Sequence, residues 1–489
     1  MTRRQLLQAA AAALPLSGAA TRYESTWDSI DRRPSPPWYQ DAKFGIFIHW
    51  GLYSVPAFAA PRAEKQNPYA EWYWNSLTKG KSGDPSGSAT WDFHRRVYGA
   101  GFEYQQFAPL FRAELFDPNR WAALFERSGA KYIVPTSKHH EGFALWPSKD
   151  ADRTWGRPWN AVSTGPKRDL LGDLTKAVRA RGLHMGFYYS LYEWYNPLWL
   201  KDKPRYVREH LFPQFKDVVT RYRPDIIFSD GEWELTSAEW HSPELLAWLF
   251  NDSPAKDNVV IDDRWGKDTR HKHGGYYTTE YTAGLQSGAH PWEESRGMGF
   301  SYGYNRMETL QDYHTSRELT LMLIDIVSRG GNFLLDIGPT ADGRIPIIME
   351  ERLTEIGDWL RANGEAIYGT RNWRSTRQWS TGTVPTFEEK EFRGEYNIRK
   401  LVDEPAPGQA RIEAFFTAKG NTVYAIVPRR LPRQLVLKDL RAADAVLLES
   451  GDKLPVHATG RSLTVTIPDA VRDKSSDRVA SVIKLGSVT

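Results

Sequence analysis

The most constraining feature of this sequence is a repeated alternation of short apolar runs and amphipathic segments over residues 43–364. The apolar runs are typical of buried strands, which we expect at residues 43–51, 131–138, 183–190, 225–230, 258–264 and 332–336. Between most of them, apolar residues recur with helical spacing, as Trp121, Leu124 and Phe125 do before Gly129. Repeated strand–helix units predict a parallel sheet covered by helices.

Polar residues stand at the C-terminal ends of the predicted strands, which favours a closed barrel over an open sheet. In a (β/α) barrel, the C-terminal ends of all strands meet in one circular mouth that holds the active site. No Gly-x-Gly-x-x-Gly or Walker-type loop follows the first strand, so the sequence does not support a nucleotide-binding sheet. We therefore predict an α/β fold with a (β/α)-barrel domain over residues 21–370.

Two regions depart from this alternation. Residues 53–111 contain clustered Gly, Ser, Asp and Pro between Lys79 and Ser88, which predicts a long excursion loop. After residue 370, short apolar runs such as those at 421–427 and 463–467 are separated by turns without intervening helices. Regular short strands of this kind predict a smaller all-β sandwich domain over residues 371–489.

The composition indicates a soluble globular protein and excludes some functions. The 489 residues are 40% hydrophobic and 25% charged, and 64 basic residues nearly balance 60 acidic ones, for a net charge of +4. This balance lacks the basic stripe of a nucleic-acid-binding protein. Without cysteine, the chain has no disulfides, thiolate metal sites or cysteine nucleophiles. A monomer and an oligomer are both compatible with the sequence.

The first 20 residues predict an export signal. Arg3 and Arg4 precede a run of leucine and alanine, and small residues follow at positions 17–20. The paired arginines favour a twin-arginine signal over a Sec-type signal. We therefore expect an exported protein, periplasmic or secreted. No later apolar run approaches the roughly 20 residues of a membrane-spanning helix.

Asp230 is the best candidate for a catalytic carboxylate, because it ends a predicted buried strand where a barrel would place it in the mouth. Glycoside hydrolysis commonly uses two carboxyl groups, which stand roughly 5–5.5 Å apart in a retaining enzyme. We expect the second one from a flexible loop over the mouth. Its candidates are Glu280, Glu293 and Glu294, which composition does not separate. A helix N-cap or an ordinary loop aspartate is the competing interpretation of Asp230.

His271 and His273 have the His-x-His spacing of a metal site. They lie in a glycine-rich stretch rather than at a strand end, and no cysteine is present to join them. We therefore expect no metal there.

Six motifs then occur in the order of a known enzyme family. They are Lys43–Pro56, Ser137–Phe143, Gly165–Asp169, Phe228–Gly231, Asp263–Gly266 and Asn332–Gly343. Over residues 25–370 the chain resembles the α-L-fucosidase family of retaining glycoside hydrolases, and the later segment is similar in texture to the β-sandwich of that family. Two positions depart from the usual motifs: Glu141 replaces a commoner aspartate, and Phe228 a common tryptophan.

The resemblance implies roles for individual residues. Asp230 corresponds to the nucleophile, Arg264 to an arginine near the second catalytic group, and Glu280 to the acid/base, with Glu293 as the alternative. Positions that match substrate-binding residues are His49, Glu71, Trp72, His139, His140, Tyr188 and Tyr302. A bend at the strand end is required for His139 and His140 to point the same way, since neighbouring strand residues face opposite sides.

The resemblance also implies an activity. It is that of an exo-acting α-L-fucosidase that removes terminal α-L-fucosyl groups from oligosaccharides or glycoconjugates by double displacement, without a cofactor. Three alternatives stay open at this point: another retaining exo-glycosidase on the same scaffold, for instance for α-galactosides; a carbohydrate-binding homologue without activity; and a metal-dependent hydrolase.

Overall fold

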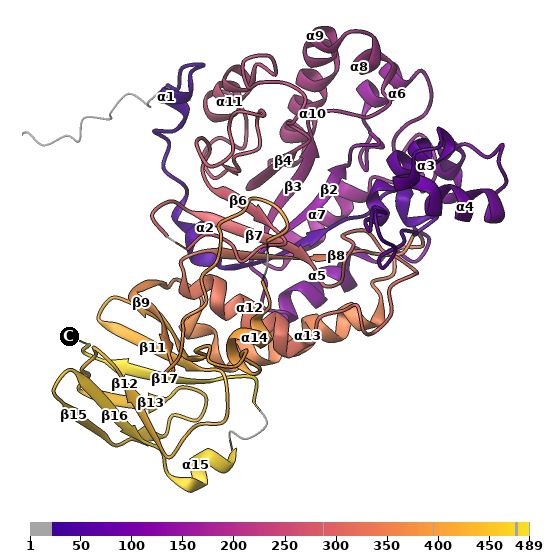
Figure 1. The fold of residues 1–489 in the computed structure, drawn as a ribbon. Helices are drawn as coiled ribbons and strands as arrows, with labels where there is room; N and C mark the ends of the chain where they lie inside the picture. The colour runs from indigo at the N-terminus through magenta and orange to yellow at the C-terminus, as the bar shows by residue number, and fades with distance from the viewer. Residues whose placement is uncertain (1–21, 287, 395, 475–477, 489) are drawn as a thin grey trace, which may run out of the picture.

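The computed structural model describes residues 22–286, 288–394, 396–474 and 478–488. The predicted export signal at residues 1–20 lies outside the described residues. The chain forms a helix-covered parallel sheet up to about residue 370 and a β-rich part after it, and the two lie side by side (Figure 1). Within the described ranges, no helix is long and apolar enough to cross a membrane.

Eight parallel strands form the barrel sheet. They are β1 (Phe44–Ile48), β2 (Tyr132–Lys138), β3 (His184–Ser190), β4 (Ile226–Asp230), β5 (Val260–Ile261), β6 (Tyr277–Glu280), β7 (Trp292–Gly297) and β8 (Asn332–Ile337). Their order is β5-β4-β3-β2-β1-β8-β7-β6. Every residue of β1 is buried, as expected for a parallel strand covered on both faces. The predicted α/β-barrel architecture is confirmed.

The curled sheet differs from a fully paired barrel at one seam. In the described part of the chain, no backbone ladder joins β5 to β6. There, Gly275 N and Tyr276 N donate to the Ile261 carbonyl at 3.0 and 3.2 Å, and the Asp263 carboxylate accepts from Thr278 N at 3.2 Å. Loop and side-chain contacts therefore replace strand pairing at this seam.

Two strands lie where the sequence predicted a flexible loop. Glu280 ends β6, and β7 contains Glu293 and Glu294. The loop prediction was wrong because neither strand has the continuous apolar run that marked the others. Their buried side chains are partly polar: the Glu294 carboxylate accepts from Thr282 N at 2.8 Å and from the Thr279 hydroxyl.

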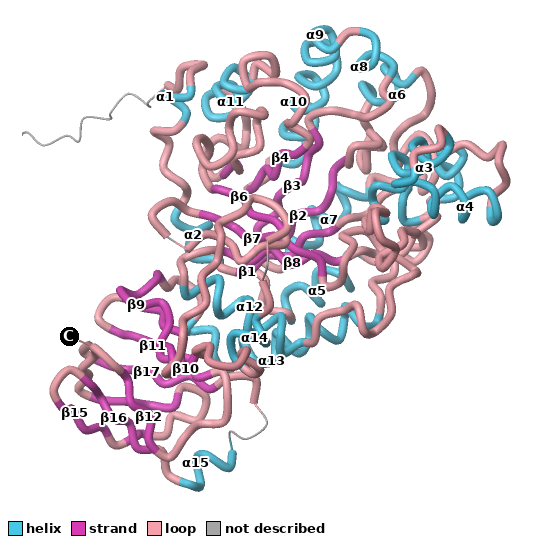
Figure 2. The backbone as a smooth tube through the Cα atoms, viewed as in Figure 1, coloured by secondary structure: helices cyan, strands magenta, loops and turns pink. Residues whose placement is uncertain are grey.

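Helices cover the outside of the sheet (Figure 2). The predicted helices correspond to α5 (Pro118–Arg127), α7 (Leu170–Ala180), α10 (Phe212–Tyr222), α11 (Ser242–Asn251), α12 (Ser316–Ser328) and α13 (Ile347–Asn363). Shorter elements are α1 (Trp27–Ile30), α2 (Pro37–Ala42), α6 (Lys149–Trp155), α8 (Pro197–Lys201), α9 (Lys203–Tyr206), the π-helical turn η5 (Val207–Leu211) and the 3-10 turn η6 (Gly364–Ala366). Asp117 caps the start of α5, because its side chain accepts from the first free backbone amides of the helix.

The predicted excursion loop at residues 53–111 is mostly helical. It contains α3 (Tyr73–Lys81) and α4 (Ser88–Val97), with the 3-10 turns η1 (Leu52–Ser54), η2 (Ala70–Trp72), η3 (Pro85–Gly87) and η4 (Tyr104–Leu110). The loop prediction was wrong because aromatic packing organises the region: the rings of Trp74 and Tyr104 stack with centroids 4.5 Å apart, and those of Phe58 and Phe93 with centroids 4.0 Å apart. We call residues 53–111 the excursion.

The C-terminal part is the predicted β-sandwich. Its six-stranded sheet has the order β14-β13-β17-β11-β10-β9, and its three-stranded sheet the order β12-β16-β15. The strands are β9 (Arg371–Trp379), β10 (Ile412–Lys419), β11 (Thr422–Val427), β12 (Gln434–Leu437), β13 (Asp444–Leu447), β14 (Lys453–Leu454), β15 (Val456–Thr459), β16 (Ser462–Thr466) and β17 (Ser481–Gly486), with helices α14 (Ile398–Val402) and α15 (Asp469–Lys474). Phe416, Leu437, Leu463 and Ile483 belong to one apolar core between the sheets.

A buried ion network joins the two parts. Asp325 of α12 accepts from Arg329 Nη2 at 3.0 Å, from Arg377 Nε of β9 at 2.6 Å and from the Tyr396 hydroxyl at 2.9 Å. Burial would raise the pKa of Asp325, but the charges of Arg329 and Arg377 outweigh it and lower the pKa, so the carboxylate stays ionised.

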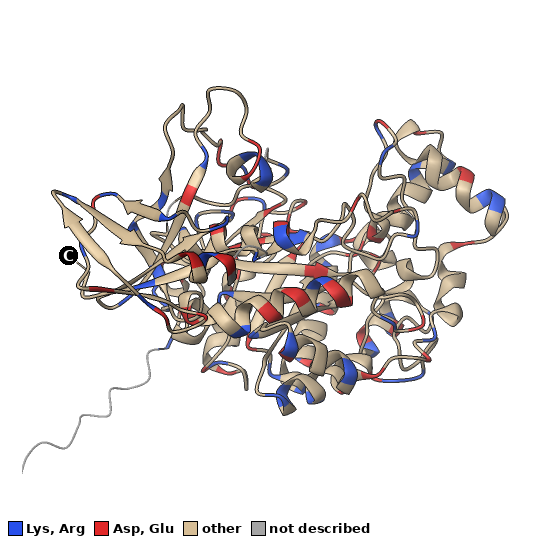
Figure 3. Ribbon diagram, turned by 90° about the horizontal axis from the view of Figure 1, so that it is seen from below, with Lys and Arg blue, Asp and Glu red and all other residues tan. Residues whose placement is uncertain are grey.

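Along the ribbon as a whole, basic and acidic positions are interspersed (Figure 3).

Asp325→Ala is expected to lower the free energy of unfolding by about 3–5 kcal/mol, because it leaves two buried guanidinium groups without their carboxylate. The matched control is Asp41→Ala, which removes a half-exposed pair with Arg371 at 2.8 Å and should cost under about 1 kcal/mol. Urea denaturation of both variants measures the difference. Equal losses of unfolding free energy in the two variants would contradict the role of Asp325 in joining the two parts of the chain.

Candidate active site

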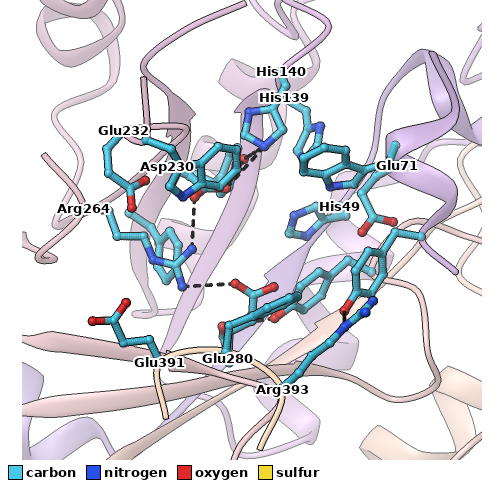
Figure 4. Close-up of a pocket in the computed structure, with 18 of the residues that line it drawn as sticks. His49, Glu71, His139, His140, Asp230, Glu232, Arg264, Glu280, Glu391 and Arg393 are labelled. Atoms are coloured by element: carbon cyan, nitrogen blue, oxygen red, sulfur yellow. Dashed lines mark hydrogen bonds and ion pairs between the residues drawn. The ribbon is translucent and has the colours of Figure 1, made fainter. Parts of the chain in front are cut away.

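The cavity at the C-terminal ends of the barrel strands has a volume of about 840 Å³ (Figure 4). Ten of the residues singled out from the sequence line it: His49, Glu71, Trp72, His139, His140, Tyr188, Asp230, Arg264, Glu280 and Tyr302. They come from strand ends, from the loops after the strands and from the excursion. Segments that are distant in sequence therefore converge on one pocket.

Asp230 is the last residue of β4, and its carboxylate is buried beneath the cavity. Arg264 Nη1 donates to Oδ1 at 3.0 Å, and the Tyr188 hydroxyl donates to Oδ2 at 2.7 Å. His140 Nε2 lies 3.5 Å from Oδ2. Burial would raise the pKa of Asp230, but the charge of Arg264 and the other neighbouring groups lower it below its usual value. The carboxylate is therefore held ionised, as a nucleophile must be.

Glu280 contacts the other end of the same guanidinium. Arg264 Nη2 donates to Oε2 at 3.2 Å, while Arg264 Nε donates to Thr278 Oγ1 at 2.9 Å. Burial raises the pKa of Glu280, and the charge of Asp230 adds to this, although Arg264 opposes it. Two carboxyl groups on one arginine thus have pKa values displaced in opposite directions. This is the pattern of a nucleophile and a proton donor.

Three histidines in the pocket are held neutral. His49 Nδ1 is hydrogen-bonded with Asp336 Oδ1 and His140 Nδ1 with Ser190 Oγ, both at 2.7 Å. Burial lowers the pKa of His49 to about 3 and that of His140 to about 4, and it lowers the pKa of His139 as well. A neutral imidazole offers one donor and one acceptor nitrogen, which suits vicinal sugar hydroxyls.

The end of β2 explains how the adjacent His139 and His140 can both line the pocket. Thr136 and Lys138 of β2 pair with consecutive residues of β3, so β2 has one extra residue there. The strand ends at Lys138, and the two imidazole rings then lie with centroids 4.2 Å apart. Strand alternation would turn one ring away, but both histidines follow the last residue of the strand, so the alternation does not hold for them.

The excursion contributes Glu71 and Trp72. Glu71 Oε2 accepts from Gly303 N at 2.9 Å and from the Ser301 hydroxyl at 3.1 Å, and burial raises its pKa to about 7. Between these two donors lies Tyr302, whose ring points into the cavity. The excursion is therefore part of the site.

An apolar patch of aromatic rings completes the pocket. The rings of Phe47 and Phe228 have centroids 4.9 Å apart, and the guanidinium carbon of Arg264 lies 4.8 Å from the centroid of Phe228. The phenylalanine that replaces the commoner tryptophan therefore packs directly on the arginine between the two carboxylates. It also leaves an apolar surface facing the cavity.

Glu293, the alternative second carboxyl, does not line the pocket. Its Oε2 accepts from the Tyr39 hydroxyl at 3.1 Å and from the Tyr132 hydroxyl, and burial raises its pKa to about 7. Glu294 is likewise occupied by the threonine contacts described above. Geometry thus favours Glu280 as the partner of Asp230.

Other cavity residues were missed by the sequence interpretation. Glu232, two positions after Asp230, accepts from Arg270 Nε at 2.6 Å, and its place just after a strand end was an available signal. Trp233 follows it. Glu391–Arg393 reach the same cavity from the C-terminal part of the chain, and no motif or strand end marked them.

His271 and His273 have separate partners. His271 Nε2 is hydrogen-bonded with the Thr278 carbonyl at 3.0 Å, and His273 Nδ1 with Asp31 Oδ2 at 2.8 Å. Across the residues that the structure describes, no group of three or more His, Asp or Glu side chains is arranged to hold a metal ion.

Comparison with known proteins identifies the family. The sequence matches the family model Alpha-L-fucosidase over residues 10–365. The chain belongs to the α-L-fucosidase family. An alpha-L-fucosidase of Dictyostelium discoideum is 49% identical over 362 residues, covering 72% of this chain and 76% of that protein. Human tissue alpha-L-fucosidase is 42% identical over 413 residues, covering 83% and 78%.

Solved structures of α-L-fucosidases have the same fold. Thermotoga maritima alpha-fucosidase is 36% identical with a TM-score of 0.76, over 95% of this chain and 100% of that one. Its complex with fucose matches with a TM-score of 0.75 and 35% identity over the same shares. Because 95% of the chain is covered, the shared architecture includes the C-terminal sandwich.

Glu293→Gln tests the buried position of Glu293 through stability. The folded-state pKa of about 7 exceeds the usual 4.5, so the contribution of Glu293 to stability is complete below pH 4.5 and is lost as the pH rises through 7. We expect the wild type to lose roughly 3 kcal/mol more than the glutamine variant between about pH 4 and pH 8. Urea denaturation at both pH values measures this, and equal pH dependence of the two proteins would contradict it.

Proposed function

We propose that this chain is an exo-acting α-L-fucosidase that hydrolyses terminal α-L-fucosyl linkages by double displacement. The observation that carries the proposal is the guanidinium of Arg264, which contacts Asp230 at 3.0 Å and Glu280 at 3.2 Å. Membership of the α-L-fucosidase family and the likeness to a fucose-bound structure support the substrate. The pocket, closed at its inner end by aromatic rings, suits a terminal sugar.

In the first step, an oxygen of Asp230 attacks the anomeric carbon of the fucosyl group. The bond between that carbon and the glycosidic oxygen breaks as the carbon–aspartyl bond forms. Glu280 gives its proton to the departing oxygen, so the aglycone leaves as a neutral alcohol. The lowered pKa of Asp230 favours its ionised form and the raised pKa of Glu280 favours its protonated form, which are the forms that this step needs.

In the second step, Glu280 removes a proton from water, which attacks the anomeric carbon and releases Asp230. Glu280 can change from proton donor to base because its pKa depends on the charge of Asp230. Part of the rise in the pKa of Glu280 comes from the charge of Asp230. Esterification of Asp230 removes that charge, so the pKa of Glu280 falls and the group becomes the ionised base that hydrolysis requires. Fucose is released with its anomeric configuration retained.

The pocket walls account for the choice of sugar. The neutral imidazoles of His49, His139 and His140 can exchange donors and acceptors with ring hydroxyls. Phe47 and Phe228 offer an apolar surface to the methyl group of fucose. Galactose has a hydroxyl on that carbon, and this hydroxyl would lose its hydrogen bonds to water against the two rings. This disfavours an α-galactosidase on the same scaffold.

We also propose that the enzyme is exported from the cytoplasm. The support for this is the paired arginine, apolar run and small-residue pattern of residues 1–20, which is typical of an exported protein.

A slow substrate, 2-fluoro-fucosyl fluoride, is expected to label Asp230. The ring fluorine destabilises the positively charged transition states of both steps, while the good leaving group lets the ester form and accumulate. Peptide mass spectrometry after an acid quench locates the label. Asp230→Ala should take up none and lose more than about 10³-fold in kcat. A label on another carboxylate would contradict the assignment.

Glu280→Ala is expected to lower kcat/KM for fucosyl glycosides with poor leaving groups by about 10²–10⁴-fold. The loss should shrink with acidic phenol leaving groups, which need no proton, and azide should restore turnover by giving α-fucosyl azide. The matched control is Glu293→Gln, expected to keep kcat/KM within about twofold because the residue does not reach the pocket. The opposite pattern would move the acid/base role to Glu293.

A further inference from the structure

A segment of the C-terminal part crosses to the mouth of the barrel. Residues 380–397, between β9 and α14, leave the sandwich and pass over β6 and β7 (Figure 1). We call this segment, of which residue 395 is not described, the strap. Its end is fixed by the Tyr396 hydroxyl on Asp325 at 2.9 Å, and Glu389 Oε1 accepts from Gln286 N at 2.7 Å.

The strap pairs with the backbone of Glu280 itself. Glu280 N donates to the Glu391 carbonyl at 2.9 Å, and Arg393 N donates to the Glu280 carbonyl at 3.0 Å. This is a parallel bridge that sets Phe392 directly opposite Glu280. Paired residues on neighbouring strands direct their side chains to the same face of a sheet. The residue beside the proposed proton donor is therefore an aromatic one from the other domain.

The position next to Glu280 determines which part of the substrate the strap would face. A proton donor must lie against the glycosidic oxygen, and the aglycone is attached to that oxygen. Side chains that flank Glu280 toward the open end of the cavity therefore face the leaving group. Phe392, Arg393 and Glu391 all line the cavity there, and Phe392 is 43% exposed although it is large and apolar.

The strap residues have the chemistry of a sugar-binding surface. Arg393 is oriented by a bond from its Nε to the Tyr69 hydroxyl at 2.8 Å, and its guanidinium carbon lies 5.1 Å from the centroid of Phe392. Among the described residues its terminal nitrogens have no hydrogen-bond partner, so they form a planar pair of donors. Glu391 lines the cavity and, in the described structure, its carboxylate has no hydrogen-bond partner. A flat ring flanked by a donor fork and an acceptor matches the apolar face and hydroxyls of a pyranose.

We propose that the strap forms a leaving-group subsite, in which a sugar residue packs on Phe392 and hydrogen-bonds with Arg393 and Glu391. The inference rests on the proposed function and names its substrate class: glycans in which fucose is linked to another sugar. The 840 Å³ of the cavity is in the range of sites for ligands larger than one deoxyhexose. The sandwich domain thus takes part in substrate selection.

The test compares leaving groups with and without a ring. The substrates are a panel of fucosyl-galactose and fucosyl-N-acetylglucosamine disaccharides, and α-L-fucosyl fluoride, whose leaving group is a single ion. The variants are Phe392→Ala and the conservative Phe392→Tyr. The matched control is Val384→Ala, which truncates an exposed apolar residue of the strap that does not line the cavity.

With Phe392→Ala we expect kcat/KM for the best disaccharide to fall about tenfold, which corresponds to about 1.4 kcal/mol. Neither kcat nor kcat/KM for fucosyl fluoride should change by more than about twofold. Phe392→Tyr should restore disaccharide hydrolysis, since it keeps a flat ring, and Val384→Ala should match the wild type.

Three outcomes would overturn the subsite. Equal losses on the disaccharide and on fucosyl fluoride would mean that the strap only positions Glu280 or supports the fold. No loss on either substrate would mean that Phe392 does not meet the leaving group. A wild type that hydrolyses fucosyl fluoride but none of the disaccharides would exclude a sugar subsite. A wild type inactive on fucosyl fluoride would instead refute the proposed function, so the two failures are distinguishable.

Discussion

The site depends on one buried guanidinium placed between two carboxylates. Arg264 is buried and reaches Asp230 with one terminal nitrogen and Glu280 with the other, while its Nε is fixed by Thr278. A planar, permanently charged fork can hold two acids in defined directions, which the point charge of a lysine cannot do. It also keeps one acid ionised, while burial raises the pKa of the other. Geometry and protonation are therefore set by the same contact.

The neutral histidines depend on a second buried cluster behind them. Lys138, the last residue of β2, donates from Nζ to Glu193 at 2.6 Å, and His210 Nε2 is hydrogen-bonded with the same carboxylate at 2.7 Å. Burial would raise the pKa of Glu193, but the charges of His210 and Lys138 lower it, so the cluster stays ionic. A buried ion pair adds little net stability, because the cost of removing its charges from water offsets their attraction. Here it fixes the strand end from which His139 and His140 turn into the pocket.

Sequence reasoning worked where one physical signal marked a residue. A polar group after a buried apolar run located Asp230, and the alternation of strands and helices gave the barrel. It failed where structure comes from contacts between distant segments. β6 and β7 have no apolar run, because their buried side chains are satisfied by one another, as Thr279 and Glu294 are. The choice of Glu280 over Glu293 rested on the family motif, since both are glutamates in short polar stretches.

The open edge of β6 shows why the second domain meets the active site. Alternate residues of this strand present their backbone groups away from β7, toward the position where a paired β5 would lie. The amide of Tyr276 is bonded to the Ile261 carbonyl, that of Thr278 to the Asp263 carboxylate, and that of Glu280 to the Glu391 carbonyl.

Buried backbone amides need hydrogen-bond partners. These three partners therefore replace the strand pairing that β6 lacks on this side. The last donor, the amide of the proposed proton donor Glu280, is satisfied by the strap. The edge of β6 therefore connects the second domain to the pocket beside Glu280, because the segment that satisfies this edge also lines the cavity.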